Sequence, residues 1–207
     1  MVLKRVFVSS RRMSKDDLIR EYRKWYYPRS TCIAYVVSNE KCQVVNQNWI
    51  CSEGTSHAEM SCINQITKWI DRDETYIMKW YMSWTPCSDC SDKVIEFLKD
   101  YTNVRLRIIA ARIYYHDNED NKRGLRSLNK ENVKLSTMKW TDYLNMWHRF
   151  IYIKDDEDIE KWELFTGMRG CARTNWRWTL DSILKDNDED SELENALSHL
   201  YIQCSNK

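Results

Sequence analysis

Apolar residues follow two different periods along the chain, and these periods predict which segments form strands and which form helices. Short apolar runs rich in β-branched residues predict strands at 31–37, 41–50, 75–83, 104–113 and 133–136. Apolar residues three or four positions apart predict helices that begin at Ser14, at Ser56 and after Thr85, and further helices near 124–128, 142–150, 170–184 and 192–202. Because a hairpin is followed by strand–helix alternation, we expect an α/β fold with one mixed sheet covered by helices on both faces.

The composition fits one compact domain and excludes disordered, collagen-like and multidomain chains. Of 207 residues, 43% are hydrophobic and 30% charged, with only 4 glycines and 2 prolines. No segment approaches the roughly 20 apolar residues of a membrane span, so we expect a soluble protein with no membrane partner. Residues 1–13 are expected to form a flexible basic arm, because the first fifteen residues include five basic and no acidic ones. We expect a single domain over 14–207.

The formal net charge of +1 conceals an asymmetry along the chain. Residues 1–152 contain 25 basic and 18 acidic residues, whereas residues 153–207 contain 7 and 13. The chain is also rich in aromatic residues, with 10 Trp and 12 Tyr. A basic part of this kind favours a polyanionic partner such as nucleic acid.

The eight cysteines would suit a disulfide scaffold in a short secreted chain. This chain is long, however, and no apolar signal segment follows its basic start. We therefore expect reduced thiols in an intracellular protein.

Two short motifs place metal-binding side chains at the beginnings of consecutive predicted helices. His57 and Glu59 open the second helix, and Cys87 and Cys90 open the third. One imidazole and two thiolates are enough to hold zinc with the fourth tetrahedral position left to water, as in catalytic sites. Glu59 is not needed as a ligand, so it is free to move protons between that water and a substrate.

Each motif also has a simpler interpretation. Glu59 could complete a capping box with Ser56, and for this motif taken alone the capping box is the better explanation. The cysteine pair could be a redox pair, or half of a structural zinc site completed by Cys51 or Cys62. The two motifs together, in this order and each at a helix start, match the H-x-E…P-C-x-x-C pattern of zinc nucleobase deaminases.

The cysteine motif lies within a longer segment, residues 83–90, with the sequence SWTPCSDC, and residues 111–115 have the sequence ARIYY. The first segment is similar to the SW[ST]PC-x-x-C signature of the AID/APOBEC polynucleotide cytidine deaminases, and the second resembles their A-R-[IL]-Y segment. The resemblance extends from about residue 13 to about residue 202. It implies a cytidine-deaminase-like fold, in which about six helices surround a five-stranded mixed sheet, and a Zn²⁺ cofactor.

The resemblance implies that further residues contact the substrate. Thr31 matches a residue on the pocket rim, and Trp84 and Tyr114 match aromatic walls around the target base. Aromatic walls suit a base that leaves the stack, since stacking contributes about 1–3 kcal/mol per base. Arg112 matches a basic residue beneath the following loop. Tyr115 stands where thymine-preferring relatives carry an aspartate. A tyrosine at this position is similar to the AID-like branch and implies a preference for a purine before the target cytosine.

The resulting hypothesis is zinc-dependent hydrolytic deamination of cytosine to uracil in single-stranded DNA, with Glu59 as the catalytic proton carrier. The resemblance also implies a role in immunity or antiviral defence. RNA is the leading alternative substrate, because the choice depends on 2′-hydroxyl contacts. A third possibility is a catalytically silent, zinc-containing nucleic-acid-binding module, which predicts a fourth protein ligand such as Cys51.

The expected partners are single-stranded DNA and RNA, and the expected state is a monomer or a weak RNA-mediated oligomer. We expect the protein in both cytoplasm and nucleus. Four apolar residues near the end of the chain have a spacing similar to that of a nuclear export signal, although an amphipathic packing helix produces the same spacing. These residues are Leu193, Leu197, Leu200 and Ile202.

Overall fold

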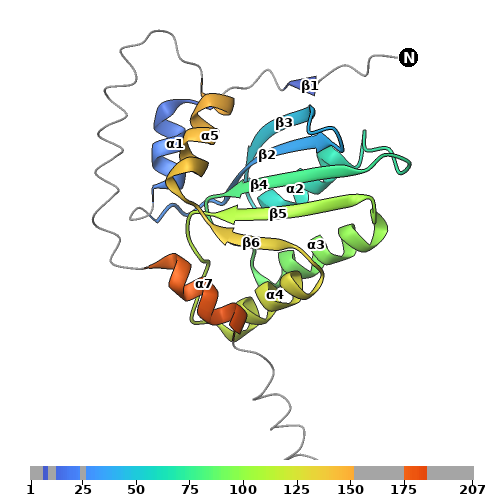
Figure 1. The fold of residues 1–207 in the computed structure, drawn as a ribbon. Coiled ribbons are helices and arrows are strands. Elements are labelled where there is room, and N and C mark those ends of the chain that lie inside the picture. Colours follow the sequence, from blue (N-terminus) through green and yellow to red (C-terminus); the bar gives the residue numbers. More distant parts are fainter. Residues whose placement is uncertain (1–6, 9–12, 24–26, 152–174, 186–207) are drawn as a thin grey trace, which may run out of the picture.

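The computed structural model describes residues 7–8, 13–23, 27–151 and 175–185, which form one mixed sheet with helices on both faces (Figure 1). The sheet order is β1-β3-β2-β4-β5-β6. Strand β2 is antiparallel to β3 and β4, whereas β4, β5 and β6 are parallel to one another. The strands are β1 (Phe7–Val8), β2 (Cys32–Asn39), β3 (Val44–Cys51), β4 (Tyr76–Met82), β5 (Val104–Ala110) and β6 (Lys134–Thr137).

The five predicted strands are confirmed as β2 to β6, and each observed end lies within three residues of the predicted one. The sixth strand, β1, belongs to the segment that we expected to be a flexible arm, and it pairs with β3 in parallel. At the end of the same segment, Met13 is buried and its N–H donates to the carbonyl oxygen of Phe150. The arm therefore contacts the domain at these described positions.

Six helices of the described chain cover the two faces of the sheet, as the α/β prediction required. Their apolar residues form two separate cores. One core joins α2, α3, α4 and α7 to one face of the sheet, and the other joins α1 and α5 to the opposite face (Figure 1). The helices are α1 (Lys15–Tyr22), α2 (Ala58–Ile66), α3 (Ser88–Asp100), α4 (Glu119–Lys130), α5 (Trp140–Phe150) and α7 (Trp176–Lys185).

Helix ends depart from the prediction more than strand ends do. The pattern predicts that the first helix continues to Pro28, but α1 ends at Tyr22, because Arg23 has an extended backbone. Helix α4 begins at Glu119, five residues before the helix predicted near 124–128. The Asn118 side chain causes this early start, since its Oδ1 accepts the backbone N–H of Asn121 and caps the helix.

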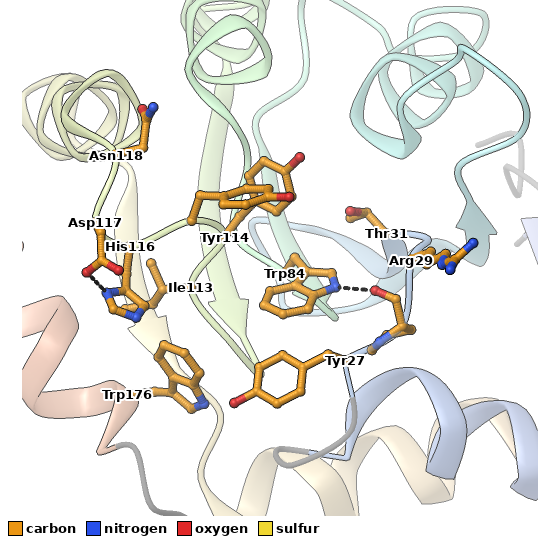
Figure 2. Close-up of a pocket in the computed structure, with 12 residues that line it drawn as sticks. Tyr27, Arg29, Thr31, Trp84, Ile113, Tyr114, His116, Asp117, Asn118 and Trp176 are labelled. Carbon is orange, nitrogen blue, oxygen red and sulfur yellow. Dashed lines mark hydrogen bonds and ion pairs between the residues drawn. The ribbon is translucent and has the colours of Figure 1, made fainter.

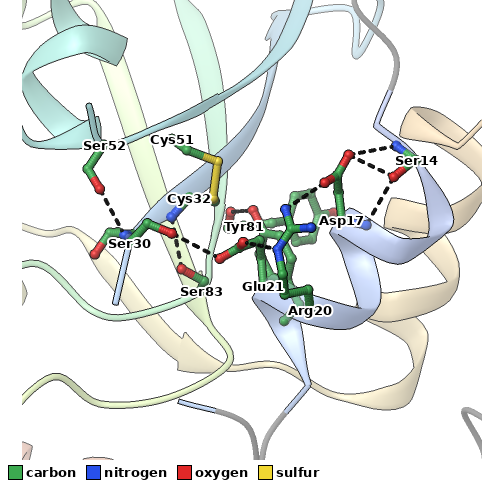
Figure 3. The surroundings of a disulfide bond; sticks show 12 residues. Ser14, Asp17, Arg20, Glu21, Ser30, Cys32, Cys51, Ser52, Tyr81 and Ser83 are labelled. Atoms are coloured by element: carbon green, nitrogen blue, oxygen red, sulfur yellow. Dashed lines mark hydrogen bonds and ion pairs between the residues drawn. A yellow bond between two sulfur atoms is a disulfide. The ribbon is translucent and has the colours of Figure 1, made fainter. Parts of the chain in front are cut away.

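The expectation that all thiols are reduced is wrong for Cys32 and Cys51, which form a disulfide (Figure 3). The two residues lie directly opposite each other on antiparallel β2 and β3, with their Cα atoms 4.0 Å apart. This pairing depends on the register of a hairpin, which cysteine spacing alone does not reveal. The bond ties the beginning of β2 to the end of β3.

Several predictions fall on residues outside the described ranges. These include the last helix at 192–202, the proposed export leucines, the first part of the helix at 170–184 and most of the basic arm. Among the described helices, none has the length and apolar character needed to cross a membrane.

Candidate active site

The two metal-binding motifs meet because β3, β4 and β5 end at the same edge of the sheet. The chain passes from β3 into α2 and from β4 into α3 at this edge. His57 is the N-cap residue of α2, and Cys87 is the N-cap residue of α3. Both have extended backbones and neither makes a side-chain capping hydrogen bond, so imidazole and thiol remain available to bind a metal.

The three predicted ligands have the spacing of a zinc site. His57 Nδ1 lies 3.1 Å from Cys90 Sγ and 3.6 Å from Cys87 Sγ, and all three ligand atoms lie within 4.8 Å of one another. Tetrahedral ligands about 2.0–2.3 Å from zinc are separated by roughly 3.3–3.8 Å. The 3.6 Å distance falls within this range and the 3.1 Å distance lies just below it, so a small outward shift of the ligands would make room for the ion. Within the described part of the chain, this is the only cluster of three such side chains that could hold a metal.

Glu59 lies on the first turn of α2 and points into the protein. Its side chain is 3% exposed, and its Oε2 has no hydrogen-bond partner. Burial raises the pKa of this carboxyl to about 7. The capping-box interpretation is wrong, because the N-cap of α2 is His57 and the Ser56 hydroxyl bonds to Ser61 instead.

Electrostatics at the cluster favour a thiolate at Cys87. A hydrogen bond from the Cys90 thiol lowers the pKa of Cys87 to about 5, with smaller contributions from the Cys90 backbone N–H and from His57. Because Cys90 donates this hydrogen bond, its own pKa is raised. A bound cation at the cluster would favour the thiolate form of both cysteines.

The structure supplies no fourth protein ligand to this cluster within the described residues. Cys51, the candidate that the silent-module hypothesis names, is bonded to Cys32 instead. Cys62 is fully buried on α2 and lies outside the cluster, and burial raises its pKa well above the ordinary value. Three ligands with one open position are the donor set of a catalytic zinc site.

A pocket of about 790 Å³ opens at the same edge of the sheet. Trp84, between β4 and α3, lies at its centre (Figure 2). Its ring lies 5.7 Å from that of Tyr27 and 6.2 Å from that of Tyr114, between ring centroids. Its indole N–H donates to the carbonyl oxygen of Pro28, 3.1 Å away. Trp84 is therefore a wall of the pocket, and its indole orientation is fixed.

Arg112 lies behind Trp84 rather than in the pocket lining. It is fully buried, and its guanidinium carbon lies 4.6 Å from the centroid of the Trp84 ring. The same guanidinium donates to the backbone carbonyl oxygens of Glu21 and Arg23. In this position Arg112 supports the aromatic wall and the end of α1 without facing a ligand in the pocket.

The other three residues predicted to contact the substrate, Thr31, Tyr114 and Tyr115, line the pocket. The backbone N–H of Tyr114 donates to the hydroxyl of Thr85, two residues before Cys87, so the pocket adjoins the segment that leads into the metal cluster. Tyr115 packs edge-on against Tyr114 with ring centroids 4.6 Å apart, and the residue is 69% exposed. Thr31 is held at the opposite rim by paired hydrogen bonds with Ser52, one of them from its N–H to the serine hydroxyl.

Residues 16–179, more than three quarters of the chain, match the family described as APOBEC3, cytosine deaminase domain. The chain belongs to this family.

Individual APOBEC3 relatives are similar over a shorter range. The chain is 29% identical over 133 residues to the human "DNA dC->dU-editing enzyme APOBEC-3H", in an alignment that covers 64% of this chain and 66% of the relative. The proteins of the same name from Macaca mulatta and Pongo pygmaeus are 28% identical over 137 residues and 27% identical over 133 residues. The alignment with the Macaca mulatta protein covers 66% of this chain and 65% of the relative. The alignment with the Pongo pygmaeus protein covers 64% of this chain and 63% of the relative. The chain therefore spans just under two thirds of the length of these curated relatives.

These matches establish the AID/APOBEC resemblance at the level of the APOBEC3 domain, and they do not confirm the expected AID-like branch. Sequence reasoning also missed pocket residues that lie far apart along the chain. Tyr27 and Trp176 line the pocket, and His116 packs against the Trp176 ring while its Nδ1 lies 2.6 Å from Asp117 (Figure 2). The abundance of aromatic residues hints at such a pocket, but only the fold assigns them to it.

Proposed function

We propose that this APOBEC3 domain catalyses the zinc-dependent hydrolytic deamination of cytosine to uracil in single-stranded DNA. The observation that carries the proposal is the buried Glu59 carboxyl, whose Oε2 lacks a hydrogen-bond partner beside three zinc ligands. An unpaired buried polar atom is costly and is justified by a ligand or a reaction. The names of the relatives, DNA dC->dU-editing enzymes, support the same reaction.

His57, Cys87 and Cys90 would hold the zinc ion, and their spacing and donor chemistry fit it. Zinc at such a site supplies a nucleophile from water near neutral pH. Glu59 accepts a proton as the water oxygen adds to C4 of cytosine, and it delivers that proton to N3. Glu59 then moves the second water proton to the amino group, which leaves as ammonia. Cytosine and water are thereby converted to uracil and ammonia.

The pocket provides the surfaces that an unstacked base needs. Trp84 and Tyr114 present aromatic rings in an edge-to-face arrangement, with 77° between their planes. Stacking on such rings is worth about 1–3 kcal/mol per base and is available to any base that leaves the strand. Tyr115, with most of its ring exposed at the mouth of the pocket, is placed to contact the neighbouring nucleotide.

Uracil formation on a cytosine-containing single-stranded DNA oligonucleotide tests the proposal, with RNA of the same sequence in parallel. The Glu59→Gln variant keeps the size of the side chain but cannot carry a proton, so we expect turnover to fall by at least about 100-fold. Zinc content should stay at one equivalent per chain. The matched control is Glu53→Gln, an exposed glutamate outside the metal cluster, which should retain full activity.

Each outcome bears on a different part of the proposal. An active Glu59→Gln variant would refute the role of Glu59, and loss of zinc from that variant would show a structural role instead. Conversion of cytosine in the RNA strand alone would show that the substrate is RNA and not DNA. No product on either polymer from a zinc-loaded protein would refute the enzymatic proposal as a whole.

A further inference from the structure

Strands β4 and β5 begin at the end of the sheet opposite to the one where the pocket opens (Figure 1). A second cavity is lined by residues at this end. It encloses about 710 Å³. Strand β6 pairs with β5 only from Arg107 onwards, so residues 104–106 of β5 have no β6 residue beside them. This step in the edge of the sheet opens the cavity, which we call the sheet notch. Its charged lining residues are Lys79, Lys99, Arg105, Arg107, Glu131 and Lys134.

The register of the strands brings three of these cations into one row. Lys79 of β4 lies directly opposite Arg107 of β5, and Arg107 lies directly opposite Lys134 of β6. Neighbouring strands are about 4.8 Å apart, so successive cations of the row are close. Arg105 lies two residues before Arg107 on the same face of β5. Like charges directly opposite each other destabilise a sheet, so this row carries a cost to folding.

The row has no internal counter-charge among the described residues. Lys79, Arg105, Arg107 and Lys134 are all exposed, and none of them makes an ion pair with a described carboxylate. Glu131 is the only acidic residue of the lining, and its carboxylate lies 3.6 Å from the ammonium group of Lys99. A concave surface of unneutralised cations attracts a polyanion and gains affinity from the counterions that the polyanion releases.

We infer that the sheet notch binds the phosphodiester backbone of single-stranded nucleic acid at a site separate from the catalytic pocket. Phosphates spaced regularly along a strand match a regular row of cations better than a single small anion does. Among the described residues, the notch lining contains no aromatic side chain on which a base could stack, so this contact reads the backbone and not the sequence. The site does not depend on the deaminase proposal, since the notch and the pocket lie at opposite ends of β4 and β5.

Binding of fluorescent oligouridylate and oligothymidylate to the zinc-loaded full chain tests this site. Strands of about 30 nucleotides are long enough, since single-strand sites span roughly 4–16 nucleotides. The test variant is Arg107→Gln/Lys134→Gln. Its matched control is Lys68→Gln/Lys93→Gln, which removes two exposed cations near α2 and on α3, the helices that cover the other face of the sheet. Neither probe contains cytosine, so turnover does not interfere.

We expect the notch variant to bind more weakly than the control. The slope of log affinity against log salt should become shallower by about 1.4, since each lost phosphate contact on a single strand removes roughly 0.7. Its midpoint of thermal unfolding should be unchanged or higher, because the repulsive row is relieved. Uracil formation on a short cytosine oligonucleotide should be the same in both variants, which separates this site from the catalytic proposal.

Three results would overturn the inference. Equal affinity and equal salt slope for the notch variant and its control would show that the notch takes no phosphate. A lower unfolding midpoint in the notch variant would show that the row is structural. If the notch variant lost binding to polyglutamate but bound both oligonucleotides as the control does, the notch would be assigned to an acidic protein segment. A difference between the two oligonucleotides would identify which backbone, RNA or DNA, the notch prefers.

Discussion

Thr85 shows how one side chain can connect the metal cluster to the pocket. The sequence predicts it as the cap of the third helix, but the cap of α3 is Cys87. The Thr85 hydroxyl instead accepts the backbone N–H of Tyr114 at 3.0 Å, and the residue is 4% exposed. It therefore ties the loop after β5, which carries the pocket tyrosines, to the segment that leads into the cysteines of the metal cluster.

Replacing Thr85 by valine should loosen this connection without changing the size of the side chain. A fully buried backbone N–H left without an acceptor costs about 1–3 kcal/mol. The Tyr114 N–H is only part-buried, so we expect the free energy of unfolding to fall by about 1 kcal/mol. We also expect KM for the cytosine substrate to rise, because Tyr114 loses its anchor. Urea unfolding and steady-state kinetics measure the two effects. Thr85→Ser, which keeps the hydroxyl, should restore both, and equal defects in the two variants would contradict this explanation.

The metal-binding cluster of His57, Cys87 and Cys90 could be predicted from the sequence because each of its two motifs occupies only three or four consecutive residues at the start of a helix. Arg112 illustrates what could not be predicted. The ARIYY motif draws attention to it, but its function follows from α1, since its guanidinium donates to the Glu21 and Arg23 carbonyl oxygens. Burial lowers the pKa of Arg112 to about 10, so it remains charged near neutral pH. Contacts across 89 residues of sequence leave no local pattern.

At the scale of elements, strands were predicted better than helix ends. Each strand of the central sheet is a short run of β-branched and apolar residues. This pattern is local, so it can be recognised in the sequence without knowledge of tertiary contacts. Helix ends depend on single capping side chains such as Asn118, which starts α4 earlier than its apolar pattern implies. The Cys32–Cys51 bond depends on strand register, and composition pointed to the opposite conclusion.

The disulfide between β2 and β3 should stabilise the chain measurably. It links residues 19 apart in sequence, and closing a loop of that length stabilises the folded state by about 3 kcal/mol. We therefore expect Cys32→Ala/Cys51→Ala to lower the free energy of unfolding by about that amount, measured by urea unfolding without reductant. The control, Cys42→Ala, removes an exposed free thiol and should have no effect.

Alkylation of the unreduced protein provides a direct check of the same bond. Cys32 and Cys51 should resist labelling after unfolding until a reductant is added, whereas Cys42 should be labelled at once. Labelling of all three without reductant would show that the thiols are reduced, as composition alone implied.

At the scale of the whole molecule, the two candidate sites lie at opposite ends of the parallel strands. The ends of β3, β4 and β5 carry the metal cluster and the aromatic pocket. The sheet notch, with its row of cations, lies at the beginnings of β4 and β5. Ligands collect at the carboxyl ends of strands in sheets of this type, which accounts for the first site. A long polymer could contact both ends of one domain, with bases read at one and phosphates held at the other.

Zinc should also act as a structural link between α2 and α3, because its ligands come from the first turns of both helices. A metal that binds only the folded state stabilises it by about 2.7 kcal/mol when free metal is 100 times its dissociation constant. We therefore expect a chelator to lower the midpoint of thermal unfolding, and added zinc to restore it in proportion to the logarithm of free zinc. Scanning calorimetry at several buffered zinc concentrations measures the dependence.

The His57→Ala variant should lose this dependence on zinc, because two cysteines alone bind the ion weakly. His148→Ala is the matched control: His148 is exposed on α5, away from the cluster, and the variant should respond to zinc as the unaltered protein does. An unfolding midpoint that does not change with zinc in the unaltered protein would mean that the cluster is already rigid without metal. In that case the hydrogen bonds of His57 with the two thiols, at 3.1 and 3.6 Å, would be sufficient to hold α2 against α3.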